Sequence, residues 1–397
     1  MSPSAREAGT FNWGSTLWHE LAHTVTLGMT DHRIPRWFSE GLSVYEERQA
    51  RPGWGEELSL AFLEAFLQER LHGIEQINDG FMRPAWPGQI QVSYYHASVI
   101  CDWIAETRGF DAILSMLREY REGADTRTVL DRALGMEPKD FDEAFGDYVR
   151  ERFAAELEVL SADRTDAPDL TAPLEEIMQY ADLHPRDYRA QMTAGSRLYS
   201  EDRAEGAVRF LERARSLLPD HAAGDGPYPL LARIYLANGQ EEEAAEVLER
   251  LVSVNEENYE AHLRYGAWLE EQGETEQAAD VLGRAIYIYP FEAELHVRRA
   301  NLLETLERFE EAVEARRAVV SLDPVDRAEA LYRLAEALAS AGMRAEARLA
   351  VLQSLEIAPT YEPALDLLLR LQPPPGTITC VPAGGPVSPT EGGPSPS

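Results

Sequence analysis

The segment His19-Glu-Leu-Ala-His23, near the start of the chain, combines residue types that bind metals with one that moves protons. Imidazoles four residues apart lie on the same face of a helix and can bind one ion. The intervening Glu20 can poise a metal-bound water for attack. The segment therefore predicts a metal-dependent hydrolase, with His19 and His23 as ligands and Glu20 as the base.

The pattern needs context, because chance produces it in roughly one or two chains per hundred of this composition. The alternative is a pair of solvated or core histidines. A helix from Ser15, a capping residue type, to Gly28, a common stop, would position the motif. On a helical wheel the two histidines and Glu20 share one face. We expect the other face to pack against the protein; it carries Leu17, Trp18, Leu21, Ala22 and Val25.

Charge and cysteine content narrow the classes of function. The 397 residues include 37 basic and 69 acidic side chains, a formal net charge of -32 that argues against nucleic-acid or membrane-surface binding. Cys101 and Cys380 are the only cysteines, too few for a disulfide framework or a cysteine-based metal site. No apolar run could span a bilayer, and Met1 to Gly14 lack a signal-peptide core. The chain as written is expected to be soluble, with its location left open because an upstream signal could have been lost.

Composition divides the chain into four parts. Residues 1–158 hold six of the seven tryptophans and five of the nine histidines, and we assign them to one domain. A polar segment with two prolines, residues 159–172, is predicted to be a linker. Residues 173–372 are rich in Ala, Glu, Leu and Arg and form a second predicted domain. Residues 373–397, rich in Pro, Gly, Ser and Thr, are predicted to be a disordered tail.

The second domain repeats with a period of about 34 residues. A small residue, an alanine 12 positions later and, with one exception, a proline 24 positions later recur in phase. The small residues are Gly195, Ala232, Gly266, Ala300 and Ala335; the alanines are Ala207, Ala244, Ala278, Ala312 and Ala347; the last position reads Pro219, Glu256, Pro290, Pro324 and Pro359. Small residues let paired helices approach, and proline ends the second helix. We predict about five helix pairs over 188–361, a half-unit at 173–185 and a closing helix at 361–371.

These repeats resemble the tetratricopeptide repeat, whose large apolar position is matched by Leu198, Tyr235, Leu269, Leu303 and Leu338. The resemblance implies a protein-binding superhelix, and hence a protein partner on its surface. It does not identify that partner, because the ligand depends on the side chains of the concave face.

A second segment, residues 35–47, extends the resemblance to the first domain. Together with the histidine motif it looks like the gluzincin peptidases, most closely the peptidase-MA-like branch that is often joined to tetratricopeptide repeats. The approximate pattern W-x-x-E-G-x-A-x-Y is matched by Trp37, Glu40, Gly41, Ser43 in place of Ala, and Tyr45. The resemblance makes Glu40 the third ligand of one Zn²⁺ per chain. A metzincin site is disfavoured, because Met29 occupies the position of its third histidine.

Two further residues receive roles beside these ligands. Glu47 lies two helical turns after Glu40 and could accept the free N–H of a zinc-bound imidazole. Residues 93–109 look like the helix that follows the ligands in these families, where a tyrosine before the helix donates to the oxyanion. That tyrosine is placed at Tyr94, with Tyr95 and His96 as alternatives.

The fold class expected from these features is mainly α: a truncated zincin-like helical metallopeptidase domain followed by an α-solenoid of tetratricopeptide repeats. Related domains carry a mixed sheet before the metal helix, which the short segment ahead of Ser15 cannot form, so the start is incomplete or substrate binds elsewhere. The function expected is a zinc-dependent peptidase whose repeats recruit peptide or protein substrates or partners. The alternative is a non-catalytic tetratricopeptide scaffold carrying an inactive peptidase-like domain. Substrate sequence, exopeptidase or endopeptidase action and oligomeric state are left open.

Overall fold

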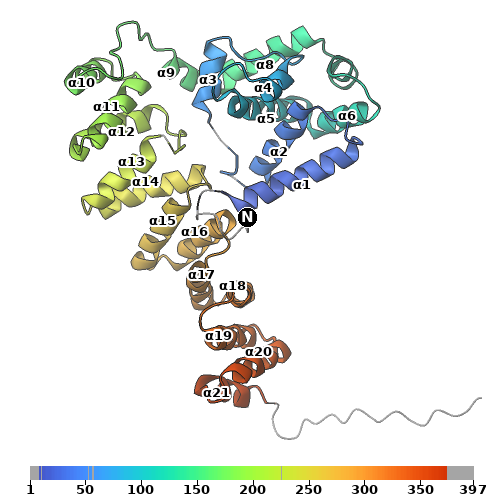
Figure 1. Ribbon diagram of the computed structural model, residues 1–397, viewed down its shortest axis with the longest axis vertical. Coiled ribbons are helices and arrows are strands. Elements are labelled where there is room, and N and C mark those ends of the chain that lie inside the picture. Colours follow the sequence, from blue (N-terminus) through green and yellow to red (C-terminus); the bar gives the residue numbers. More distant parts are fainter. Residues whose placement is uncertain (1–8, 10, 52, 56–57, 225, 373–397) are drawn as a thin grey trace, which may run out of the picture. The chain divides into compact units, whose positions relative to one another are not determined.

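The computed structural model describes residues 9, 11–51, 53–55, 58–224 and 226–372, and all regular elements of these residues are helices (Figure 1). This confirms the predicted mainly α fold class. The chain forms two compact units, divided between Leu302 and Leu303. No helix of the described residues is long and apolar enough to cross a membrane. The predicted disordered tail lies outside the described residues.

The first part of the chain folds into short and medium helices around one apolar core. Its elements are α1 (Trp13–Met29), α2 (Arg36–Ala50), α3 (Leu60–Leu67), α4 (Ile77–Met82), α5 (Gln89–Arg108), α6 (Phe110–Arg121), α7 (Thr126–Val129) with the π-helical turn Leu130–Leu134, α8 (Pro138–Arg152) and α9 (Ala154–Leu160). Trp37, Phe38 and Phe62 are fully buried at the centre of this core. The core therefore packs directly behind α2, the helix that follows the histidine motif.

The helices α2 and α5 pack unusually closely. A Cβ atom on Gly41 would lie 2.6 Å from the main-chain oxygen of Ala97, so only glycine permits this approach. Farther along the same pair, Arg48 of α2 forms a buried ion pair with Asp102 of α5 at 2.8 Å and donates to Ser98 Oγ at 3.1 Å. The glycine of the sequence pattern and this ion pair therefore fix α2 firmly on the core.

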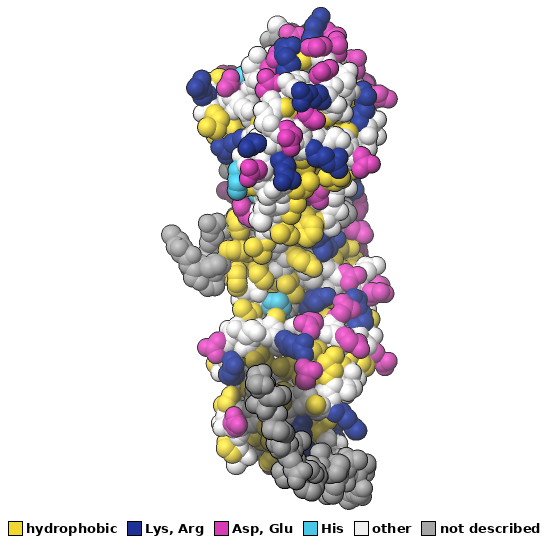
Figure 2. All heavy atoms as spheres, turned by 90° about the vertical axis from the view of Figure 1, so that its right-hand side faces the viewer, with side chains coloured by type: hydrophobic (Ala, Val, Ile, Leu, Met, Phe, Trp, Pro, Cys, Tyr) yellow, Lys and Arg dark blue, Asp and Glu magenta, His cyan; other side chains and the backbone are white. Residues whose placement is uncertain are grey.

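The face of α1 that packs is the opposite of the one expected. Helix α1 begins after Asn12, whose side-chain oxygen accepts from Ser15 N at 3.0 Å, and the polar histidine face lies against α2. The apolar side chains of Leu17, Trp18 and Leu21 are 41–64% exposed. Apolar side chains gather on the face drawn in Figure 2, which looks onto the side of Figure 1 where α1 and α6 lie. The expectation of a packed apolar face is thus wrong, because a wheel separates two faces without showing which one meets the core.

The second part consists of paired helices. After α10 (Leu174–Leu183) these are α11 (Tyr188–Ser200), α12 (Ala204–Leu217), α13 (Pro227–Ala237), α14 (Glu241–Val254), α15 (Tyr259–Gln272), α16 (Thr275–Ile288), α17 (Ala293–Thr305), α18 (Phe309–Ser321), α19 (Arg327–Ser340), α20 (Arg344–Ile357) and α21 (Glu362–Arg370). The first unit holds α10 to α16 and most of α17. The second unit begins near the end of α17.

The small residues of the repeat pattern pack within these pairs. The five recurring alanines, from Ala207 to Ala347, are fully buried. A Cβ atom on Gly195 or Gly266 would lie 2.7 or 2.5 Å from a leucine of the following helix. Asp187 and Asn258 cap α11 and α15 by accepting from main-chain N–H groups. The repeat period of the sequence therefore corresponds to closely packed helix pairs.

Candidate metal centre

The three side chains predicted to bind metal converge between α1 and α2. Glu40 Oε2 lies 3.3 Å from His19 Nε2 and 3.1 Å from His23 Nε2. One ligand atom from each residue lies within 4.8 Å of the other two. The i, i+4 spacing puts the two imidazoles on one face of α1, and the packing of α2 against that face delivers the carboxylate.

This donor set fits a zinc ion. Zinc binds imidazole nitrogens and carboxylate oxygens at about 2.0–2.2 Å in a tetrahedron, which separates neighbouring ligand atoms by about 3.3 Å. The two measured separations from Glu40 Oε2 match that value. Three protein ligands also leave a fourth position, as catalytic zinc sites require. His19, His23 and Glu40 would hold the ion.

Outer partners orient both imidazoles. Glu47 Oε1 lies 2.6 Å from His19 Nδ1, and Glu47 Oε2 accepts from Ser15 Oγ. His23 Nδ1 lies 2.9 Å from Ser39 Oγ and 3.2 Å from the hydroxyl oxygen of Ser43. These contacts occupy the Nδ1 atoms and direct the Nε2 atoms toward the shared position.

The structure places Glu47 where the sequence predicted, whereas the serines at positions 15 and 39 had no metal-site role in that prediction. Ser39 precedes Glu40, so its presence near the site follows from the helix once Glu40 is placed. Ser43 was recognised only as a small residue of the pattern. In the structure its hydroxyl oxygen lies 3.2 Å from His23 Nδ1, a contact that alanine could not make.

Electrostatics prepare this group for a cation. Burial alone would lower the pKa of His19, but hydrogen bonds with Glu40 and Glu47 outweigh it and raise the pKa to about 9. Burial would raise the pKa of Glu40, yet its hydrogen bonds with both histidines hold that pKa well below its ordinary value. Two buried carboxylates within reach of one imidazole therefore favour positive charge here, supplied by a proton or by a metal ion.

Glu20, the candidate base, is exposed on α1. It lines a hollow of about 450 Å³ together with His19 and Glu47. The same hollow is bordered by Phe11 and by Glu257, which belongs to the repeats. Glu20 is therefore open to solvent and borders the same hollow as His19.

The three candidate oxyanion donors lie in different surroundings. Tyr94 is within α5, not before it, and Arg36 Nη2 lies 3.5 Å from its hydroxyl while Arg36 Nε lies 3.3 Å from Glu40 Oε1. Tyr95 and His96 are buried among core rings, and burial lowers the pKa of His96 to about 3. Of the three, Tyr94 is thus the one brought to the ligand group. Its role stays a prediction, and the expectation that it precedes the helix is wrong.

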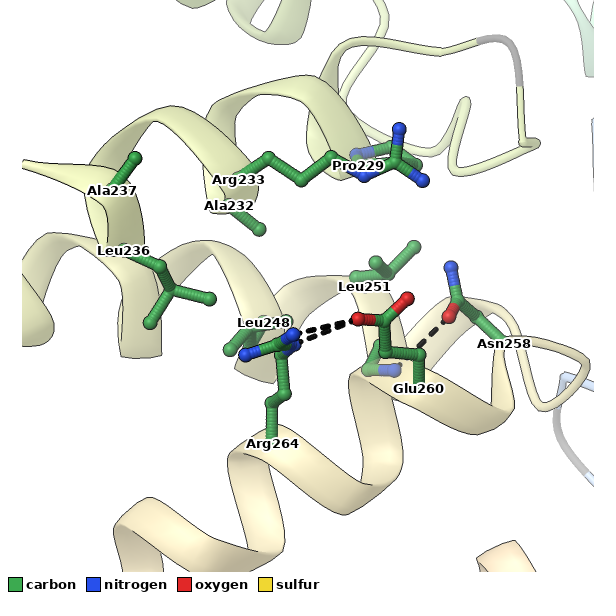
Figure 3. Close-up of a pocket in the computed structure, with 11 residues that line it drawn as sticks. Pro229, Ala232, Arg233, Leu236, Ala237, Leu248, Leu251, Asn258, Glu260 and Arg264 are labelled. Atoms are coloured by element: carbon green, nitrogen blue, oxygen red, sulfur yellow. Dashed lines mark hydrogen bonds and ion pairs between the residues drawn. The ribbon is translucent and has the colours of Figure 1, made fainter.

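A second hollow lies on the repeats (Figure 3). It measures about 350 Å³ and lies among α13, α14 and α15. Arg264 forms an ion pair with Glu260 at 2.8 Å on its wall, and Arg233 extends from α13 on the opposite side. Leu248 and Leu251 provide an apolar floor.

Comparison with known protein families finds matches both in the first domain and in the repeats. A profile of the Peptidase MA superfamily matches residues 6–151, and tetratricopeptide repeat profiles match 198–257, 230–293 and 297–362. No protein of curated function matches the chain.

Three solved structures illustrate what the chain is similar to. They are YrrB, "a TPR protein with an unusual peptide-binding site" (21% identity, TM-score 0.34, covering 49% of this chain and 98% of that one), MamA from Desulfovibrio magneticus RS-1 (17%, 0.29, 44% and 97%), and a thermophilic TPR protein of Thermus thermophilus (27%, 0.21, 46% and 96%). Each spans less than half of this chain. Residues 6–151 thus form a Peptidase MA superfamily domain, and tetratricopeptide repeats follow it in the same chain.

Proposed function

We propose that this chain is a zinc-dependent peptidase that hydrolyses peptide bonds and whose repeats recruit substrate or partner proteins. The observation that carries the proposal is the convergence of His19, His23 and Glu40, with Glu20 exposed in the adjoining hollow. The Peptidase MA profile over this region supports it.

The side chains divide the work of hydrolysis among them. A zinc ion held by the three ligands would polarise the amide carbonyl and lower the pKa of a bound water to about 7. Glu20 accepts a proton from the attacking water and later gives it to the leaving nitrogen. The hydroxyl of Tyr94, held beside Glu40 by Arg36, donates to the oxygen on which negative charge develops.

The repeats supply the recruiting surface in this proposal. The hollow among α13, α14 and α15 offers leucine side chains at its floor and guanidinium and amide groups at its walls. Such a surface can hold an extended or helical protein segment through both apolar and polar contacts. The repeats would thereby raise the concentration of substrate near the catalytic domain.

The decisive experiment measures bound zinc and hydrolysis together. Wild-type protein and Glu20→Gln are analysed for metal by mass spectrometry and assayed on casein and a peptide library. We expect one zinc per chain in both proteins and cleavage by the wild type alone, because Glu20 moves protons without binding the metal. Equal cleavage by the two proteins would refute the mechanism. Zinc in both without cleavage by either would favour the non-catalytic scaffold.

A further inference from the structure

One residue breaks the repeat pattern, and it lies beside the metal domain. Four of the five positions that end a second helix are proline, whereas the position between α14 and α15 is Glu256. This residue is only 4% exposed. A glutamate buried where the pattern calls for proline requires a specific set of partners.

Those partners belong mostly to the metal domain. Glu256 N donates to Gly53 O at 3.1 Å, a bond that proline could not make. Its carboxylate accepts from Arg51 Nε at 3.0 Å and pairs with Arg284 Nε at 3.1 Å. Its main-chain oxygen accepts from Asn12 Nδ2 at 3.0 Å. The main-chain N–H, the main-chain oxygen and the carboxylate of Glu256 thus each bind a residue of the first domain, and Arg284 of the repeats pairs with the same carboxylate.

A continuous series of hydrogen bonds leads from Glu256 to a metal ligand. The same Asn12 side chain that donates to Glu256 caps α1, because its Oδ1 accepts from Ser15 N at 3.0 Å. Ser15 Oγ donates to Glu47, and Glu47 Oε1 lies 2.6 Å from His19 Nδ1. Every member of this series before His19 is buried. A shift at the repeat turn would therefore be transmitted to the imidazole rather than absorbed by solvent.

Aromatic side chains extend the same contact. The rings of Trp54 and Tyr287 lie 5.8 Å apart, and the guanidinium of Arg51 lies 4.4 Å from the centre of the Tyr287 ring. Trp13, at the first position of α1, meets Phe291 edge-on at 5.4 Å. Both the start of α1 and the segment after α2 are thus held by the third helix pair and the turn that follows it.

We propose that the α14–α15 turn of the repeats, through Glu256 and Asn12, positions the metal centre. The repeats then act as a structural part of that centre as well as a recruiting surface. Glu256 is a positioning residue: it sets the start of α1, and so the geometry of Ser15, Glu47 and His19. Glu257, the next residue, borders the hollow that contains Glu20, so the same turn also forms a wall of the cleft. This inference rests on the metal-binding part of the proposed function and does not depend on catalysis.

Two substitutions in the full-length chain test the inference. Asn12→Asp keeps the oxygen that caps α1 but loses the N–H donated to Glu256. Glu256→Pro introduces the residue of the other repeats and removes the N–H and the carboxylate together. The preceding Asn255 already has the extended backbone (φ -140°, ψ 100°) that a following proline requires. The repeat itself is therefore expected to tolerate the change.

The readouts are zinc affinity, by competition with a chelator, and the visible absorption spectrum of the cobalt-substituted protein, which reports ligand geometry. We expect both variants to bind zinc about tenfold more weakly, the lower end of the effect of an outer-shell partner, and to alter the cobalt spectrum. Asn258→Asp is the matched control, because the side chain of Asn258 caps a helix in the same way, accepting from Ala261 N at the start of α15 at 3.0 Å. Glu256→Gln keeps both main-chain hydrogen bonds and should therefore retain most of the wild-type zinc affinity.

Unchanged zinc affinity and cobalt spectra in both variants would overturn the inference. Circular dichroism checks that each variant is folded, and Asn12→Asp keeps the test decisive should Glu256→Pro fail to fold. A wild type that binds no zinc would reject the metal site itself, and the inference with it. A wild type that binds zinc but cleaves nothing would reject only the catalytic proposal and leave this test intact.

Discussion

Replacing Glu47 with glutamine tests whether the carboxylate behind His19 tunes the metal site. Glu47 is buried, 2.6 Å from His19 Nδ1, and also accepts from Ser15 Oγ. Glutamine has nearly the same shape but carries no charge, so Glu47→Gln removes the charge assistance and leaves the packing intact. The histidine ring should keep its place while becoming a weaker electron donor to the metal.

Two effects of opposite sign decide how much Glu47→Gln changes the zinc affinity. Loss of an outer-shell partner of a metal-bound imidazole costs 10–100-fold in affinity, about 1.4–2.7 kcal/mol. Against this, the pKa of His19 is about 9 without metal, because hydrogen bonds with Glu40 and Glu47 outweigh burial, so zinc must displace a proton at pH 7. Two pH units correspond to about 2.7 kcal/mol of proton competition, part of which disappears with Glu47. We therefore expect a small loss of affinity at pH 7 and a larger one at pH 9, where His19 is already half deprotonated.

Chelator-buffered zinc titrations at the two pH values measure this. Glu46→Gln is the control, because it makes the same chemical change one position away, on the side of α2 that faces the hollow bordered by α1 and α6. The ratio of wild-type to Glu47→Gln affinity should rise with pH and exceed that of the control at pH 9. Equal affinities for the two variants at pH 9 would refute the assigned role of Glu47.

Three further outcomes follow from the geometry. Gly41→Ala should destabilise the protein by about 1–3 kcal/mol in denaturant unfolding, because its Cβ would lie 2.6 Å from a main-chain oxygen of α5, whereas Gly28→Ala, with open space around it, should be neutral or slightly stabilising. Tyr94→Phe should lower kcat about 100-fold with little change in KM; a change in KM alone would exclude a role in the transition state. Burial lowers the pKa of His96 to about 3, so the stabilising contribution of this neutral imidazole is present above pH 6.5 and is lost as the pH falls toward 3. The free energy of unfolding should therefore drop by about 2 kcal/mol between pH 6.5 and pH 5. His96→Leu should reduce that drop.

The grouping of the candidate ligands could be predicted from the sequence because the relation between the two histidines is local. His19 and His23 share a helix, and the spacing alone places their imidazoles on one face. Glu40 is on the next helix, and its assignment came from a family pattern rather than from any rule that brings two helices together. Gly41, a letter of that pattern, acquires a physical reason only in the structure, where it permits the approach of α2 to α5.

Features that depend on how the helices pack could not be predicted from the sequence. The apolar residues around Leu21 were expected to be buried, yet the buried carboxylates of α2 draw the polar face of α1 inward instead. The register of Tyr94 within α5 could not be fixed by a comparison that tolerates a slip of one residue. Glu256 did leave a signal, as the one position of its kind without proline. Its meaning required knowing that Arg51 and Gly53 lie against it.

Buried carboxylates in an already acidic chain need an explanation, and the proposed metal centre would supply one. Glu40 and Glu47 lie within hydrogen-bond reach of the same imidazole, in a region where burial opposes charge. Without metal, protonated His19 and the guanidinium of Arg36, whose Nε lies 3.3 Å from Glu40 Oε1, offset these two negative charges. A divalent ion bound by neutral imidazoles would replace the proton on His19, so metal binding and protonation of this group compete. The close contact at Gly41 and the Arg48–Asp102 ion pair hold α2 on the core. They thereby keep Glu40 and Glu47 near the same imidazole despite the repulsion between the two carboxylates.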